Sequence, residues 1–298
     1  MNAYYAVDRH SVASVVDDLL NQFRSSAGSS YAFALMDLAF DHGCKAFVWA
    51  SAYTRLYATE PLAQLAAISP ALIELCAHDE NVLSRQLGRL LRHANGRPML
   101  SFLQTDLTAN ALIAYWQPFL SADMEDGESY LLRWADTRVV PVLARHLHSN
   151  NWALVTKPLG SWVFINRSGR LEQLPMSCTF QSEAQPLQRI VLSTEELDQL
   201  LKAGEPDAVI QALYETLPCL LPESQRMEFY EHVAECCELA ARHGIDAFPD
   251  VVALAAASCL SGRGGVADPR WEEVLVRRDW HAGKFAERLV DLLPQEVE

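Results

Sequence analysis

The sequence predicts an α/β amino-terminal lobe, a mixed sheet with flanking helices, followed by an all-α carboxyl-terminal lobe. Apolar runs of strand length alternate with helix-like patterns over the first ~190 residues. Strand signals largely vanish after Leu192, where helical patterns follow one another. Charge changes there too: residues 193–298 carry 21 acidic and 9 basic side chains, a net of −12, against 17 and 15 elsewhere. We therefore expect a mixed α/β domain over 1–180 and a helical lobe over 193–298.

Apolar runs and turn signals predict the strands of the first domain. Strands are expected at 31–40, 69–75, 98–105 and 130–135, and a hairpin at 161–175. Asp126-Gly127 is typical of a tight turn, and Gly169 supplies the positive φ that the hairpin turn needs.

Helices are expected between these strands. The spacing of apolar residues predicts them at 12–23 and 80–93, and a weaker pattern runs to about residue 52. A further helix is expected after Thr105 or Asp106, either of which can cap it. The last is expected from Val140, with Pro141 at its first position.

The helical lobe is expected to open with a capping box, in which Ser193 or Thr194 pairs with Glu196. Helical segments then follow at about 194–203, 206–217, 222–243, 248–260, 268–276 and 281–293. The glycine-rich SGRGG at 261–265 does not follow a strand and has no Lys-Ser/Thr after it. We therefore interpret it as a connector between helices and not as a phosphate-binding loop.

Composition narrows the classes of function. Half of the residues are apolar and 21% are charged, which is typical of a globular protein with a full core. The sequence shows no run long enough to span a membrane and no signal peptide, so we expect a cytoplasmic protein. The seven cysteines include no CxxC pair and are expected to be reduced and mostly buried. The net charge of −14 repels phosphate backbones, which makes nucleic acid an improbable partner.

No pattern of catalytic, metal-ligating or cofactor-binding residues stands out, and we assign none. His232 and Cys236 are four residues apart on an expected helix, with His243 seven further on, so a metal site is geometrically conceivable. The Ala/Leu-rich context favours buried core thiols instead. No GxSxG motif is present, and the paired carboxylates lie on expected helix exteriors.

The stretch YLLRWADTRVVPVL places Arg133, Asp136 and Arg138 inside or just after an apolar run. Charged groups are rarely desolvated unless they are paired. We favour a strand-to-helix turn in which Asp136 accepts hydrogen bonds from the following N–H groups, and Arg138 folds back toward Asp136 or toward a neighbouring loop. The alternative is a partner-binding patch at the carboxyl end of the strand.

The same residues resemble a known family. LLRWADTRVVPVL (131–143) is similar to the signature of bacterial type VI secretion adaptors, also called effector chaperones, which carry the domain of unknown function 4123. Other similar pieces follow in the family's order: YAFALMDLAFD (31–41), LAAISPALIEL (65–75) and the block from 98 to 139. The resemblance spans roughly residues 30–175. Thr137 stands where the family usually has proline, and Leu132 and Trp134 differ from its signature aromatics.

The resemblance implies a binding function. Such adaptors pair a mixed α/β lobe with a variable helical lobe, bind one toxic effector and help to load it onto the spike protein (VgrG-type). The signature residues Arg133, Asp136 and Arg138 would then be structural, with partner contact as the alternative, and the protein would not be an enzyme. An immunity protein that neutralises a toxin, or a hydrolase with an unrecognised site, stays open.

The helical lobe is the expected place for effector recognition. Its acidic surface is suited to a basic segment, and apolar strips between helices are suited to an amphipathic helix. Candidate effector contacts are its aromatic residues, although core packing is the expectation for any single one of them. These candidates are Phe229, Tyr230, Trp271, Trp280 and Phe285.

Overall fold

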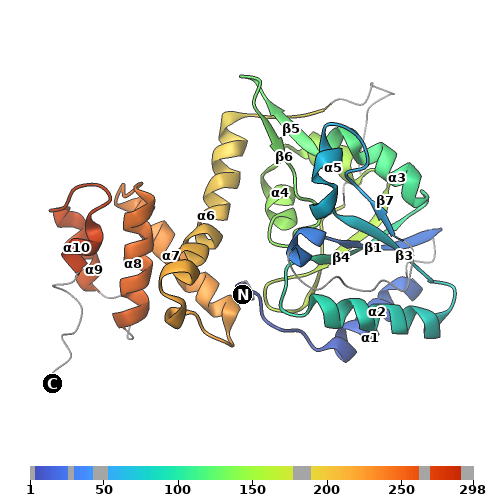
Figure 1. The fold of residues 1–298 in the computed structure, drawn as a ribbon, viewed down its shortest axis with the longest axis horizontal. Coiled ribbons are helices and arrows are strands. Elements are labelled where there is room, and N and C mark those ends of the chain that lie inside the picture. The colour runs from blue at the N-terminus through green and yellow to red at the C-terminus, as the bar shows by residue number, and fades with distance from the viewer. Residues whose placement is uncertain (1–3, 26–29, 43–52, 177–188, 262–268, 290–298) are drawn as a thin grey trace. The chain divides into compact units, whose positions relative to one another are not determined.

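The computed structural model describes residues 4–25, 30–42, 53–176, 189–261 and 269–289. They form two compact units (Figure 1). The α/β unit comprises residues 9–200, and the helical unit comprises residues 1–8 together with 201–298. The first unit combines sheets with helices and the second is helical, so the predicted fold class is confirmed.

A six-stranded sheet in the order β2-β3-β1-β4-β7-β8 forms the centre of the α/β unit. Every neighbouring pair in it is antiparallel, with Ala34 of β1 opposite Ile73 of β3 and Phe102 of β4. β1 is buried along most of its length, as its continuous apolar run requires. The strands are β1 (Tyr31–Met36), β2 (Tyr53–Arg55), β3 (Ala71–Leu75), β4 (Leu100–Thr105), β7 (Leu159–Ile165) and β8 (Leu171–Gln173).

A second, three-stranded sheet has the order β6-β5-β9. β5 (Ser121–Met124) and β6 (Ser129–Leu131) form a hairpin whose turn contains Gly127 at φ 91°, the conformation predicted for the Asp-Gly turn. β9 (Ile190–Leu192) joins β5 in parallel. This sheet is therefore mixed.

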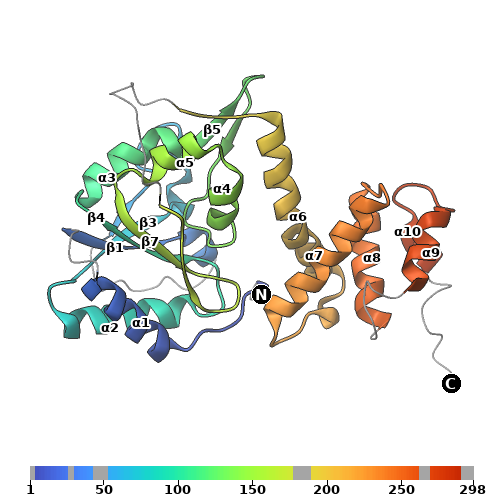
Figure 2. The same cartoon turned by 180° about the vertical axis from the view of Figure 1, so that it is seen from behind.

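Helices cover both faces of the main sheet (Figures 1 and 2). α1 (Val12–Ser25) and α2 (Glu80–Ala94) lie side by side on one face. The other face carries α3 (Ala109–Trp116), α4 (Val140–His146) and α5 (Ser149–Thr156). Short 3-10 segments follow β1 (η1, Leu38–Asp41), precede β3 (η2, Leu62–Ile68) and follow α3 (η3, Gln117–Phe119). α2 begins after Asp79, whose carboxylate accepts the N–H groups of residues 81 and 82 at 3.0 Å.

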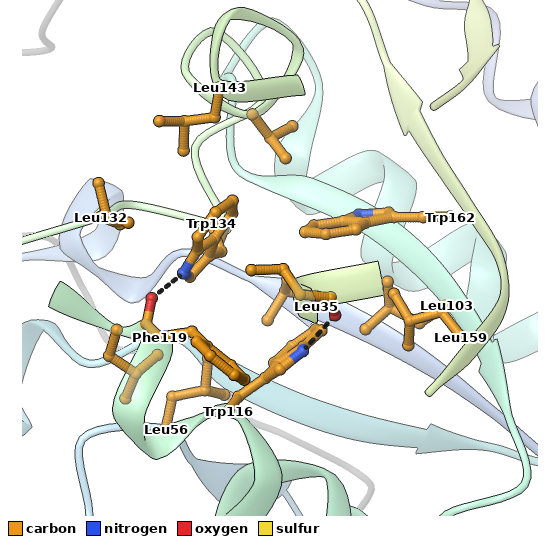
Figure 3. Packing of buried hydrophobic residues seen from close by; sticks show 14 of the residues in the cluster. Leu35, Leu56, Leu103, Trp116, Phe119, Leu132, Trp134, Leu143, Leu159 and Trp162 are labelled. Carbon is orange, nitrogen blue, oxygen red and sulfur yellow. Dashed lines mark hydrogen bonds between the residues drawn. The ribbon is translucent and has the colours of Figure 1, made fainter. Parts of the chain in front are cut away.

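The core of the α/β unit is rich in tryptophan (Figure 3). Trp116, Trp134, Trp152 and Trp162 are buried together with aliphatic side chains from both sheets. Trp134 Nε1 donates to the carbonyl of Phe119 at 2.7 Å, and Trp116 Nε1 donates to that of residue 155 at 3.0 Å. These bonds satisfy the polar end of each ring, which would otherwise be costly to bury.

The helical unit contains five helices among its described residues. They are α6 (Thr194–Thr216), which crosses the boundary between the units, α7 (Arg226–Arg242), α8 (Phe248–Ser261), α9 (Pro269–Arg277) and α10 (Phe285–Leu289). η4 (Pro218–Leu220) lies between α6 and α7. The predicted capping box opens α6: Ser193 and Glu196 exchange hydrogen bonds at 2.9 and 3.2 Å. Within the described parts of the chain, no helix has the length and hydropathy to cross a membrane.

The first residues of the chain belong to the helical unit. Tyr4 packs against Phe229, and its ring lies 4.8 Å from the guanidinium of Arg226. The N–H of Arg226 donates to a carboxylate oxygen of Asp8 at 2.8 Å, which provides a partner for the start of α7. These contacts explain why residues 1–8 group with the helical unit rather than with the expected 1–180 domain.

Several expected elements differ from the structure in extent. The strand predicted at 31–40 ends at Met36, and the strand predicted at 130–135 ends at Leu131. The helices predicted at 194–203 and 206–217 are one helix that continues through Pro206, and α5 was not predicted. The SGRGG connector, most of the pattern before residue 52 and the end of the last predicted helix lie outside the described residues.

Candidate functional site

The three charged residues singled out from the sequence meet at one corner of the α/β unit, together with Asp37. Arg133 donates through Nη2 to Asp37 Oδ2 at 2.7 Å, and its Nη1 lies 3.0 Å from Asp136 Oδ2. Arg138 donates to the same carboxylate through Nε at 3.1 Å and Nη2 at 2.8 Å. We call Asp37, Arg133, Asp136 and Arg138 the charged corner.

The backbone around Asp136 has the predicted conformation of a capped turn. Asp136 Oδ1 accepts the N–H of Arg138 at 3.0 Å, and its carbonyl accepts those of residues 139 and 140 at 3.0 Å as α4 begins. Of the two orientations expected for Arg138, the structure shows the one toward Asp136. Thr137 donates its N–H to the carbonyl of Pro98 at 3.0 Å, a bond that proline at position 137 could not make.

Asp37 fixes the other half of the charged corner. It follows β1 and caps η1, because its Oδ1 accepts the N–H of Ala39 at 3.0 Å. Its own N–H donates to the carbonyl of Met99 at 2.9 Å. Burial raises the pKa of Asp37 above its ordinary value, against the opposing effect of the Arg133 guanidinium. Removing Arg133 would therefore leave a buried carboxylate without its counter-charge.

An aromatic ring and a second ionic group adjoin the charged corner. Phe40 lies 5.2 Å from the guanidinium of Arg133 and 5.4 Å from that of Arg138, both within cation–π range. The next residue, Asp41, accepts from Arg97 Nη1 at 2.7 Å and from His93 Nε2 at 2.9 Å. Burial works against ionisation of Asp41, but these hydrogen bonds hold its pKa below the ordinary value.

The arrangement is suited to bracing the fold. Asp37 and Asp136 are buried, whereas Arg133 and Arg138 keep 35% and 19% of their side chains exposed. Two carboxylates face two guanidinium groups, so the formal charges balance. Each carboxylate is held by guanidinium and backbone N–H donors, and the set contains no serine, cysteine or histidine. Leu132 and Trp134, on either side of Arg133 in the sequence, point into the core (Figure 3).

The alternative, a partner-binding patch at the carboxyl end of the strand, stays a prediction. Arg133 lies just beyond the carboxyl end of β6 in the small sheet, and its side chain is partly exposed. Sequence reasoning missed Asp37, Phe40, Asp41 and their partners. One signal was available: Asp37 interrupts an otherwise apolar run, as Arg133 does.

The candidate effector contacts of the helical unit divide by burial. Phe229, Trp271 and Phe285 are buried in its core, whereas Tyr230 and Trp280 are half-buried and pack against that core. The Trp280 ring lies 4.4 Å from that of Phe285. Core packing accounts for all five side chains. Partner contact by any of them stays a prediction, and of the five only Tyr230 and Trp280 have a partly exposed ring that a partner can reach.

The outer face of α7 carries a row of glutamates. Glu228, Glu231, Glu235 and Glu238 are exposed and follow the three- and four-residue spacing of one helix face. Among the described residues, no salt bridge neutralises the last three. We call these four residues the acidic ridge. It is a local source of the excess negative charge seen in the sequence.

The metal interpretation of His232, Cys236 and His243 gains no support. Cys236 is buried in the core of the helical unit, and His243 Nε2 lies 4.0 Å from a carboxylate oxygen of Glu272. Burial lowers the pKa of His232. Across the described ranges, no three His, Cys, Asp or Glu side chains gather as a metal site would require.

An open cavity of about 480 Å³ lies on the α/β unit between α1 and the β7–β8 edge. Half of its lining residues have amide or hydroxyl side chains, and Glu172 is the one charged residue in the lining. The Ser161 hydroxyl, which lines the cavity, donates to Gln104 Oε1 at 2.6 Å, and the lining contains no histidine. The lining therefore offers no nucleophile and base in contact. The residues that line the cavity are Asn21, Gln22, Gly160, Ser161, Val163, Leu171, Glu172 and Gln173.

The fold and the charged corner define a protein with an α/β scaffold braced by buried ion pairs and a separate helical unit. Residues 32–154 match a family model described as "Domain of unknown function (DUF4123)". The matched segment includes Asp37 and the whole charged corner. No curated protein and no solved structure matches the chain.

Proposed function

We propose that this protein is a cytoplasmic adaptor that binds a type VI secretion effector and helps to load it onto the spike protein. The observation that carries the proposal is the match of residues 32–154 to the DUF4123 family model. The matched segment contains the LLRWADTRVVPVL stretch that resembles the adaptor signature. The whole chain folds into an α/β unit and a helical unit, which is the two-part organisation that the resemblance implies.

The geometry of the signature residues supports a scaffold role for them. Arg133, Asp136 and Arg138 form ion pairs with each other and with Asp37. These ion pairs, together with the backbone bonds of Asp37 and Thr137, join the end of β1, the segment before β4 and the start of α4. A partner would then bind elsewhere on a surface that this corner keeps in shape.

The acidic ridge is the surface that we propose for effector recognition. Four glutamates along three turns of α7 create a field that attracts a basic segment and accelerates its encounter. Half-buried Tyr230 lies on the same helix but outside the face that the glutamates form. The ridge thus offers electrostatic steering of a basic segment.

The test is co-purification of the full-length protein with the product of the toxin gene encoded beside it. The informative variant is Glu231→Gln with Glu235→Gln, which removes two charges from the ridge. The matched control is Glu272→Gln with Glu273→Gln, because these exposed residues of α9 change the net charge equally in the same unit. We expect the ridge variant to bind about tenfold more weakly at low salt and the control to bind nearly as the wild type does.

Two outcomes would count against parts of this proposal. Absence of any complex between the full-length protein and the neighbouring toxin would contradict the adaptor function itself. Equal binding by the ridge and control variants would move the effector surface away from α7. Protection of cells that express the toxin, with this protein as the sole added factor, would favour an immunity protein instead.

A further inference from the structure

A cysteine and a histidine meet just beyond β3 in the α/β unit. Cys76 follows the last residue of that strand, and His78 lies two residues further on in a turn. Cys76 Sγ is 3.3 Å from His78 Nε2 and 3.8 Å from Nδ1, so the thiol and the imidazole are within hydrogen-bonding distance. The thiol is half-buried and the histidine is exposed, which leaves the pair open to small molecules.

Hydrogen bonds from α2 and the turn hold this pair in place. The N–H of Cys76 donates to Gln86 Oε1 at 2.9 Å, and Gln86 Nε2 donates back to the carbonyl of Glu74 at 3.4 Å. Within the turn, the N–H of Ala77 donates to the carbonyl of Leu75 and that of Asp79 to the carbonyl of Cys76. The backbone that carries the thiol is therefore fixed relative to the backbone that carries the imidazole.

The other described cysteines lack this combination. Burial raises the pKa of Cys236 and of Cys237 to about 12, and that of Cys259 to about 11. Cys219 is exposed, but no histidine contact is recorded for it in the described part of the chain. The thiolate is the nucleophile in thiol chemistry, so a thiol needs both access and a proton acceptor to react readily.

We propose that Cys76 is a modification site for low-molecular-weight disulfides, with His78 as the base that activates it. His78 takes the thiol proton, and the Cys76 sulfur forms a bond to one sulfur of the incoming disulfide. The reagent's own S–S bond breaks, its electron pair stays on the departing sulfur, and the proton passes from His78 to that sulfur. The products are a mixed disulfide on Cys76 and one free thiol, and the reagent disulfide is the oxidant.

Charges near the pair favour a cationic disulfide. Three carboxylates, those of Glu74, Asp79 and Glu80, lie within four residues of Cys76. Asp79 caps α2, and Glu80 forms an ion pair with Arg24, the one cation recorded in contact with these three groups among the described residues. The three carboxylates and Arg24 together carry a formal charge of −2, which attracts a cationic reagent and repels an anionic one. Cystamine, a small dication at neutral pH, is therefore the probe of choice.

The experiment treats the full-length protein with cystamine and follows each cysteine by peptide mapping and mass spectrometry over time. We expect Cys76 to react about tenfold faster than Cys219 in the same sample. In His78→Gln the rate at Cys76 should fall to about that of Cys219, while Cys219 itself is unchanged. Unchanged fluorescence of the four buried tryptophans of the α/β unit shows that the variant keeps the fold around position 78.

Two results would overturn the proposal. One is reaction at Cys76 that is no faster than at Cys219 in the wild type. The other is an unchanged Cys76 rate in His78→Gln with unchanged tryptophan fluorescence, which would show that accessibility alone governs the reaction.

Discussion

Replacing Asp136 by asparagine tests the charged corner most directly. The asparagine can still accept the N–H of Arg138, but it has no charge to offset the two guanidinium groups that face Asp136 at 2.8 and 3.0 Å. Breaking a buried ion pair from one side typically costs about 3–5 kcal/mol. Arg133 keeps its bond to Asp37, and both arginines are partly exposed, so we expect the lower end, about 3 kcal/mol of unfolding free energy.

Urea unfolding followed by tryptophan fluorescence measures this loss, because four tryptophans lie in the core of the α/β unit. The control is Asp18→Asn, since Asp18 is exposed on α1 and should change stability by less than about 0.5 kcal/mol. A loss below about 1 kcal/mol in Asp136→Asn would refute the view that this carboxylate braces the fold.

A substitution at Arg133 in the charged corner tests whether this residue braces the fold or contacts the effector. Arg133→Met keeps the aliphatic stem and removes the bridge between Asp37 and Asp136. We expect a lower urea midpoint, with the effector affinity of the remaining folded protein within about twofold of the wild type. An unchanged midpoint together with lost effector binding would show that Arg133 contacts the partner.

Three further predictions concern buried groups elsewhere. Burial lowers the pKa of His10 below 6.5, so the unfolded chain binds the proton more readily. Stability should therefore fall as pH drops through that value, and His10→Gln should flatten this slope in urea midpoints measured against pH. Asp250 accepts the N–H groups of Gly283 and Phe285 at 2.8 Å, and Asp250→Ala should cost about 3 kcal/mol and speed hydrogen exchange at both amides. Leu103→Ala should cost about 2–5 kcal/mol of unfolding free energy because its side chain is fully buried, whereas exposed Leu201→Ala should leave the urea midpoint nearly unchanged.

The glutamates of α7 carry a different kind of prediction from these stability changes. They are exposed and contribute little to folding, so their substitution should alter association and its salt dependence alone. A binding defect in the ridge variant with an unchanged urea midpoint would therefore separate recognition from folding. The reverse pattern is expected at the charged corner.

Local patterns in the sequence were sufficient for much of the fold. The capping box at Ser193, the Asp-Gly turn and the turn at Asp136 each depend on residues within four positions of one another. Amphipathic spacing placed α1 and α2 correctly for the same reason, because neighbouring turns of a helix determine which residues share a face. Short-range geometry was thus readable without knowledge of the tertiary structure.

Strand length was decided by pairing partners, which the local pattern does not contain. β6 ends at Leu131 because β5, its partner, pairs with it over three positions. The apolar residues beyond it, Leu132 and Trp134, are buried by the core rather than by a strand neighbour. Apolar character alone does not separate these two kinds of burial.

By itself, the sequence determined a mixed α/β lobe, a helical lobe, an uneven charge and the capped turn at Asp136. Only the tertiary structure decided that Arg133 also pairs with Asp37, 96 residues earlier, and that Phe40 lies against both arginines. It also decided which aromatic residues of the helical lobe are buried. The physical reason is that contacts across such separations depend on how β1, β4 and α4 pack together, and local propensity carries no information about that packing.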